Sequence, residues 1–80
     1  MLTSYIRAAM RRAKYEILPD EKAYYGEIAG FQGVYSRANN LEACREELES
    51  ALEDWILFRV SRGLALPVVD GLKLEVAEVA

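Results

Sequence analysis

The sequence contains no histidine, a single cysteine (Cys44), two prolines and one tryptophan. Without histidine, the chain lacks the most frequent acid–base group near neutral pH and the most common metal ligand. A lone cysteine excludes an internal disulfide, and no apolar run reaches the length of a membrane-spanning helix. We therefore expect a protein of the cytoplasm, with no catalytic site, no cofactor, no metal and no membrane contact.

The chain has 80 residues and a formal charge of −3, from 10 basic and 13 acidic side chains. A chain of this length forms one domain, residues 1–80, and buries only about 60% of its unfolded surface, so that a partner or self-association would stabilise it. The net charge gives no general attraction to nucleic acid. The charges are nevertheless segregated, with an early basic group of Arg7, Arg11, Arg12 and Lys14 and a later acidic group of Glu42, Glu46, Glu47, Glu49, Glu53 and Asp54.

The spacing of apolar residues predicts two helices and several short strands. Apolar side chains at helical spacing predict helices over residues 3–12 and 41–62. Alternating or β-branched segments predict strands over 14–18, 23–28, 33–38 and 72–76. The order α-β-β-β-α-β with short connections predicts an α+β fold, in which an antiparallel sheet of three to four strands packs against the long helix.

Capping signals delimit the long helix. Asn40 has a side chain suited to the N-cap, and Glu42 places negative charge in the first turn. Gly63 is suited to the C-cap, and Pro67 prevents the helix from continuing. Cys44 falls on the apolar stripe of this helix, which indicates a small buried hydrophobic residue and not a nucleophile.

Three glycines interrupt the aromatic stretch YYGEIAGFQGVYS at residues 24–36. We expect Gly26 to mark the point where the long helix approaches the sheet, since a larger side chain would hold the two apart. Gly30 and Gly33 are expected to let the following loop turn tightly while Phe31 folds back.

Alternation along the strands predicts one sheet face that no helix covers. This face would carry two tyrosines among four charged side chains: Lys14, Glu16, Tyr25, Glu27, Tyr35 and Arg37. Tyrosine offers both apolar area and a hydroxyl, a combination that is common in protein interfaces. The same residues are also compatible with ordinary cross-strand pairs on a solvated sheet.

The segment Tyr24–Val34, a short strand, and the helix start Asn40-Leu41-Glu42-Ala43-Cys44 together resemble the HicB-like antitoxins. The resemblance covers residues 13–62 and is greatest for short members that begin with an extra helix. Ala29 and Gln32 stand where the family usually has proline, so the loop is expected to be less rigid. Asn40 replaces a threonine and keeps the capping oxygen.

The resemblance implies an antitoxin of a bacterial type II toxin–antitoxin system, with a degraded ribonuclease H-like fold that lacks catalytic carboxylates. Its partner would be a small basic HicA-like ribonuclease toxin, which the antitoxin neutralises by covering the RNA-binding surface. The residues predicted to bind the toxin are Tyr25, Glu27, Tyr35, Asp20 and Glu21. Direct DNA binding is not carried over, because residues 64–80 are too few for a helix-turn-helix module.

Two other functions remain open. The order α-β-β-β-α is superficially similar to double-stranded-RNA-binding domains, and the early basic residues are suited to phosphate contacts. Alternatively, the chain is an orphan oligomeric interaction module. The end of the long helix has more apolar side chains than one sheet face can cover, which predicts a homodimer or higher oligomer through Trp55, Ile56, Leu57 and Phe58.

Overall fold

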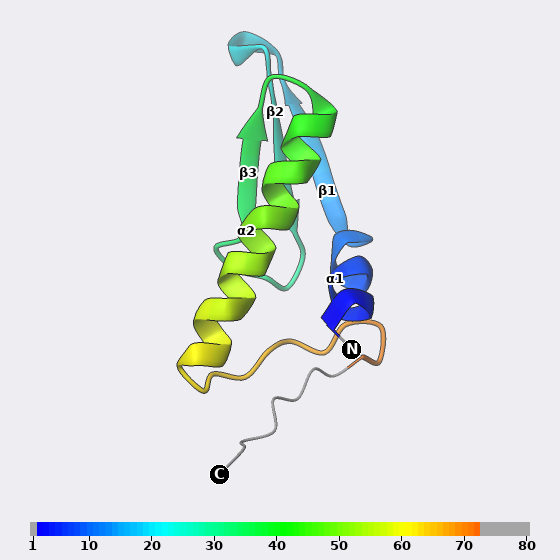
Figure 1. The fold of residues 1–80 in the computed structure, drawn as a ribbon. Helices are drawn as coiled ribbons and strands as arrows, with labels where there is room; N and C mark the ends of the chain where they lie inside the picture. The colour runs from blue at the N-terminus through cyan, green and yellow to red at the C-terminus, as the bar shows by residue number, and fades with distance from the viewer. Residues whose placement is uncertain (1, 73–80) are drawn as a thin grey trace.

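The computed structural model describes residues 2–72 and shows the predicted α+β architecture (Figure 1). Its elements are α1 (Leu2–Met10), β1 (Ala13–Leu18), the 3-10 helix η1 (Pro19–Glu21), β2 (Ala23–Ile28), β3 (Tyr35–Ala38) and α2 (Leu41–Ser61). The predicted strand over 72–76 lies outside the described residues apart from Leu72. No helix within residues 2–72 combines the length and the apolar character needed to cross a membrane.

The three strands form an antiparallel sheet in the order β1-β2-β3. Gly26 of the central strand pairs with Tyr15 on one side and with Ser36 on the other, which fixes the register of the whole sheet. The long helix α2 runs across one face of this sheet, and α1 lies beyond the end of β1 at which the chain enters it (Figure 1).

The core lies between α2, the sheet and α1. Leu48, Leu52 and Ile56 of α2 are buried, and they pack with Tyr5, Ala8, Ala9, Ile28, Phe31, Val34 and Val69. Phe31 is only 2% exposed, with its ring centroid 6.3 Å from that of Tyr5 and 5.1 Å from that of Trp55. The expectation that Phe31 folds back is therefore confirmed.

The ends of α2 agree closely with the sequence signals. The side-chain oxygen of Asn40 accepts a hydrogen bond from the backbone N–H of Ala43 at 2.8 Å. At the other end Gly63 has φ +66°, and the N–H of Leu64 returns to the carbonyl of Arg59 at 2.8 Å. This left-handed cap satisfies a terminal carbonyl and stops the helix.

Two boundaries differ from prediction by two residues each. The helix predicted over 3–12 ends at Met10, because the chain turns at residues 11–12 so that Ala13 can pair with Ile28. The strand predicted over 33–38 begins only at Tyr35. Gly33 has φ +93°, and Val34 donates its N–H to the carbonyl of Phe31 at 3.1 Å, so that these residues form a turn and not a ladder.

The expected role of Gly26 is corrected in part. A β-carbon built at Gly26 would lie 3.0 Å from the ring of Tyr15 and 3.2 Å from the Ser36 hydroxyl. The space above Gly26 is thus taken by its two cross-strand neighbours. Ser36 makes the contact to the helix, donating a hydrogen bond from its hydroxyl to the carbonyl of Cys44 at 2.8 Å.

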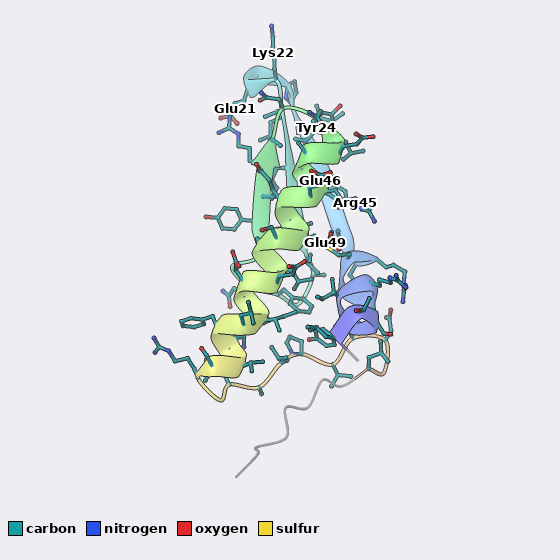
Figure 2. The ribbon with its side chains drawn as sticks, in the orientation of Figure 1. Glu21, Lys22, Tyr24, Arg45, Glu46 and Glu49 are labelled. Atoms are coloured by element: carbon teal, nitrogen blue, oxygen red, sulfur yellow. The ribbon has the colours of Figure 1, made fainter. Side chains whose placement is uncertain are left out.

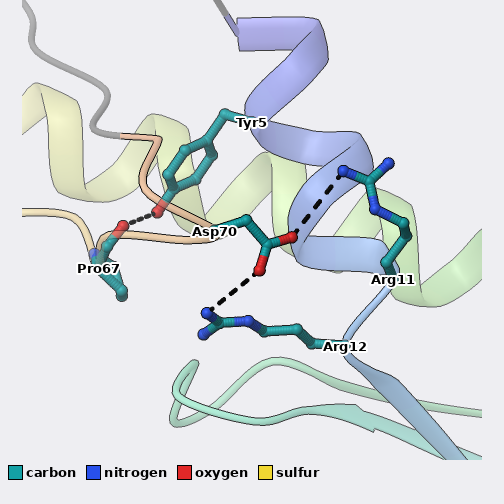
Figure 3. A network of polar contacts seen from close by, with 5 residues as sticks. All are labelled: Tyr5, Arg11, Arg12, Pro67 and Asp70. Atoms are coloured by element: carbon teal, nitrogen blue, oxygen red, sulfur yellow. Dashed lines mark hydrogen bonds and ion pairs between the residues drawn. The ribbon is translucent and has the colours of Figure 1, made fainter.

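Residues 64–72, here called the C-terminal strap, return from α2 to α1 (Figure 1), and Figure 3 shows their polar contacts with Tyr5, Arg11 and Arg12. The Tyr5 hydroxyl donates a hydrogen bond to the carbonyl of Pro67. Asp70 lies 3.9 Å from the Arg11 guanidinium and 3.6 Å from that of Arg12. The strap also buries Val69 completely, so it contributes to the core.

Candidate protein-binding surface

The face of the sheet opposite α2, here called the bare face, carries the six predicted residues. In the observed register Lys14, Glu27 and Tyr35 lie side by side across the strands, and Glu16, Tyr25 and Arg37 form the neighbouring row. Of these six residues, Tyr25 is half-buried and the others are exposed. The prediction of which side chains share this face is confirmed.

Two tyrosines form an aromatic pair on the bare face. Tyr25 and Tyr35 lie diagonally across β2 and β3, with ring centroids 6.2 Å apart and an interplanar angle of 23°. Tyr35 is 61% exposed, which is a large free surface for an aromatic side chain. A stacked pair of this kind presents a flat aromatic surface together with hydroxyls.

Two carboxylates, Glu27 and Glu16, lie near the Tyr25 hydroxyl. Partial burial raises the pKa of the Tyr25 hydroxyl, and the adjacent Glu27 carboxylate raises this pKa further. The hydroxyl therefore stays protonated at neutral pH and remains a hydrogen-bond donor. Glu27 belongs to none of the ion pairs found within residues 2–72.

A groove of about 490 Å³ lies at one end of the bare face. Tyr25, Glu27 and Tyr35 form its sheet side, and the loop residues 28–34 complete it. Gly30 and Gly33 have φ values of +86° and +93°, so the loop turns as expected from its glycines. The structure thus brings together three of the five predicted toxin-binding residues around one groove.

The other two predicted residues lie elsewhere. Asp20 and Glu21 belong to η1, which forms the tip of the β1–β2 hairpin at the opposite end of the sheet from the groove (Figure 2). Glu21 lies 3.0 Å from the guanidinium of Arg37 on the bare face. Glu21 therefore compensates the charge of Arg37, while Asp20 belongs to none of the ion pairs within residues 2–72.

The residues predicted for self-association are only partly at the surface. Ile56 is 3% exposed and belongs to the core, so its assignment to a contact surface is wrong for this monomer. Trp55 is half-buried between Phe31 and the guanidinium of Arg59. Leu57 and Phe58 are 66% and 52% exposed. Leu57 also lines a small apolar groove of about 120 Å³ with Leu2, Ile6, Glu53 and Ile56.

The basic residues near α1 divide into two groups. Arg11 and Arg12 lie near Asp70, whereas Arg7 belongs to none of the ion pairs within residues 2–72. Arg45 of α2 lines a groove of about 350 Å³ with Arg7, Met10, Arg11 and Glu49. Sequence reasoning missed Arg45, because the contact between α1 and α2 that brings it near Arg7 is long-range.

Cys44 lies on the side of α2 that faces the sheet and is fully buried. Its sulfur lies 3.3 Å from the Ser36 hydroxyl and 3.6 Å from the carbonyl of Tyr24. The expected inward position of this side chain is confirmed. Within residues 2–72, no three histidine, cysteine, aspartate or glutamate side chains are grouped closely enough to hold a metal ion.

The fold and the exposed tyrosine–carboxylate surface define a small α+β protein with one sheet face uncovered within residues 2–72. A family model described as UPF0150-like matches residues 4–67, so the chain belongs to the UPF0150-like family. This family is related to the HicB-like antitoxins.

Among solved structures, the chain is similar to TTHA0281 from Thermus thermophilus. The two share 43% sequence identity and a TM-score of 0.90, and the match covers 96% of this chain and 95% of the other. A comparison with curated proteins gives no significant match.

Proposed function

We propose that this protein is an antitoxin-like binding protein that neutralises a small basic HicA-like ribonuclease toxin. It would act as a binding partner and not as an enzyme, by covering the RNA-binding surface of the toxin. The observation that carries this proposal is the bare face, where Tyr25, Glu27 and Tyr35 surround one groove. The relation between the UPF0150-like family and HicB-like antitoxins supports it.

Charge and shape on the bare face suit a basic protein partner. Lys14 and Arg37 are its two cations, and Arg37 is paired with Glu21. Two carboxylates on the bare face, Glu16 and Glu27, belong to no ion pair within residues 2–72, and neither does Asp20 at the tip of the β1–β2 hairpin. Unpaired carboxylates steer a basic partner and suppress acidic ones, while the tyrosines supply apolar contact area.

The proposal is tested by co-expressing the chain with the protein of the adjacent reading frame. We expect relief of growth arrest and a stable complex on gel filtration. The variant Glu27→Arg should weaken the complex by about tenfold or more, because it places a like charge against the basic partner. Glu46→Arg on α2, remote from the bare face, is the matched control and should leave affinity unchanged (Figure 2).

Unrelieved growth arrest together with the absence of a complex would refute the antitoxin role. One of the two alternatives, a nucleic-acid-binding protein, is tested by titrating labelled double-stranded RNA at low salt. The groove lined by Arg7, Arg11 and Arg45 is the surface that would bind phosphate. Affinity that falls steeply with salt and is lost in Arg45→Gln would favour this alternative.

We also propose that the chain forms a homodimer or higher oligomer through the exposed side of α2. Leu57 and Phe58 leave apolar area in solvent, and Leu57 continues into the apolar groove beside Leu2. Covering this area would stabilise a small domain. Light scattering should give a mass above that of one chain, and Leu57→Lys should reduce it; a monomer at all concentrations would refute this proposal.

A further inference from the structure

The groove at the end of the bare face has the composition of a site for a planar cation. Its sheet side contains one carboxylate, Glu27, and the stacked rings of Tyr25 and Tyr35. Glu27 and Tyr35 are direct cross-strand partners, and Tyr25 is the diagonal neighbour of Tyr35. Negative charge and aromatic surface therefore meet at one point of the molecule.

Neither of the neighbouring cations forms an ion pair with Glu27. Lys14 is its cross-strand partner, yet the two side chains form no ion pair. Arg37 lies one row further along the face, and its guanidinium is held 3.0 Å from Glu21. An exposed carboxylate that forms no ion pair within the chain is open to a cation from outside.

We infer that this groove binds an arginine side chain of the protein partner, with Glu27 pairing with the guanidinium and the Tyr25 and Tyr35 rings contacting it. This inference rests on the proposed function and names the group that the site recognises. A planar guanidinium binds a carboxylate through two parallel hydrogen bonds. It also stacks on aromatic faces and loses less hydration than an ammonium group does.

The groove has room for a whole arginine side chain. Its volume of about 490 Å³ exceeds what one guanidinium group fills, and the loop residues 28–34 line the remainder. Phe31 and Val34 of that loop are buried, as is Ile28 at the end of β2, and this burial holds the loop against the core. The aliphatic stem of an arginine can therefore lie along the loop while its charged end reaches Glu27.

The inference is tested with a short fluorescein-labelled arginine peptide, measured by fluorescence anisotropy at low salt. Two comparison peptides carry citrulline, which keeps the side-chain shape without the charge, or lysine. The arginine peptide should bind at least about tenfold more tightly than the citrulline peptide, and more tightly than the lysine peptide. Amide shifts in an NMR titration should be confined to β2, β3 and residues 28–34.

Substitutions in the groove test whether the arginine peptide binds there. Glu27→Gln keeps the shape of an exposed side chain and should weaken arginine-peptide binding about fivefold to tenfold. Tyr35→Leu keeps apolar area without the aromatic face and should weaken it about threefold or more. Glu46→Gln removes one negative charge from α2 and should have no effect, which controls for net charge. Circular dichroism verifies that each variant is folded.

Equal binding of the arginine and citrulline peptides, or equal losses in Glu27→Gln and Glu46→Gln, would overturn the inference. Equal binding of arginine and lysine peptides would overturn the assignment of a guanidinium. The proposed function fails independently of this result. A toxin complex insensitive to Glu27→Gln would keep the function and remove the arginine site, whereas peptide binding without any toxin complex would keep the site and remove the function.

Discussion

The two faces of the sheet are built from alternate residues of the same strands and yet differ in how their side chains are packed and exposed. On the covered face Tyr15, Gly26 and Ser36 form one row, with the Ser36 hydroxyl bonded to α2. On the bare face the next row contains Lys14, Glu27 and Tyr35, of which Tyr35 is 61% exposed. A step of one residue along a strand therefore changes a packing contact into a surface group.

This difference separates stability from recognition. Residues on the covered face have little space for change, because the Tyr15 ring and the Ser36 hydroxyl already occupy the volume above Gly26. Residues on the bare face touch few neighbours, so their identity is free to follow the chemistry of a partner. The following substitutions test this separation, beginning with the largest expected effect.

Leu48→Ala should destabilise the fold by about 2–5 kcal/mol, because it leaves a cavity between α2 and the covered face. Leu48 is fully buried there. Leu41→Ala on the same helix is the matched control, since Leu41 is 48% exposed and lies outside the proposed self-association surface, and should change stability by less than about 0.5 kcal/mol. Urea unfolding followed by circular dichroism measures both. Similar losses in the two variants would contradict the observed orientation of α2.

Gly26→Ala should cost about 1–3 kcal/mol, since the new methyl group would press against the Tyr15 ring at 3.0 Å. The cost depends on that ring. In a double-mutant cycle, Tyr15→Ala should therefore be less costly in the Gly26→Ala protein than in the wild type. Strictly additive effects would show that the methyl group is accommodated without the ring.

Ser36→Ala should cost about 1 kcal/mol through loss of the hydrogen bond to the Cys44 carbonyl. The adjacent substitution Tyr35→Ser falls on the bare face and should change stability by less than about 0.5 kcal/mol while weakening partner binding. Chemical denaturation measures the stability of both variants, and a binding titration measures their affinity for the partner. A larger loss of stability in Tyr35→Ser than in Ser36→Ala, or weaker partner binding only in Ser36→Ala, would contradict the division between the two faces.

High pH should destabilise the protein through the tyrosines on the packed side. Burial raises the pKa of Tyr15 and of Tyr5 above the ordinary value of 10.0, although Arg45 and Arg12 respectively lower these pKa values. Above about pH 10 the unfolded chain loses these protons while the folded chain retains them, so stability falls as pH rises. Below that pH their contribution is fully present.

Urea midpoints at about pH 8 and about pH 10.5 measure this effect. The drop in stability between the two pH values should be smaller in Tyr5→Phe and in Tyr15→Phe, because phenylalanine does not ionise. If both variants lose as much stability as the wild type between the two pH values, the loss at high pH arises from other ionisable groups.

Glu21→Gln should have the smallest effect, below about 1 kcal/mol, because both members of its ion pair with Arg37 are about half exposed. The difference from wild type should vanish in high salt, where the pair is screened. A loss that persists in high salt would indicate a contact other than the ion pair.

Short-range patterns predicted most of this fold. Alternation along β1, β2 and β3 identified all six residues of the bare face, because a strand places successive side chains on opposite sides. The start of α2 followed from Asn40 and its end from Gly63, since capping depends on nearby residues alone.

The incorrect or missing predictions concern contacts between distant residues. Ile56 belongs to the apolar excess of α2 in sequence, but α1 and the strap enlarge the core beyond one sheet face and bury it. The pairing of Asp70 with Arg11 and Arg12 joins segments far apart in the sequence, and no local pattern indicates it. Likewise, the Tyr15 ring above Gly26 required the sheet register.

The strap joins the two ends of the described chain. The Tyr5 hydroxyl of α1 donates a hydrogen bond to the carbonyl of Pro67, and Val69 of the strap is buried with Ala8 and Ala9 in the core. Detaching the strap would therefore remove the hydrogen bond to Tyr5 and the packing of Val69 against α1. Because α1 is short, its stability depends on such tertiary contacts. The backbone amides of α1 and of the strap should exchange with deuterium as one cooperative unit, whereas those of β2 should open only with global unfolding.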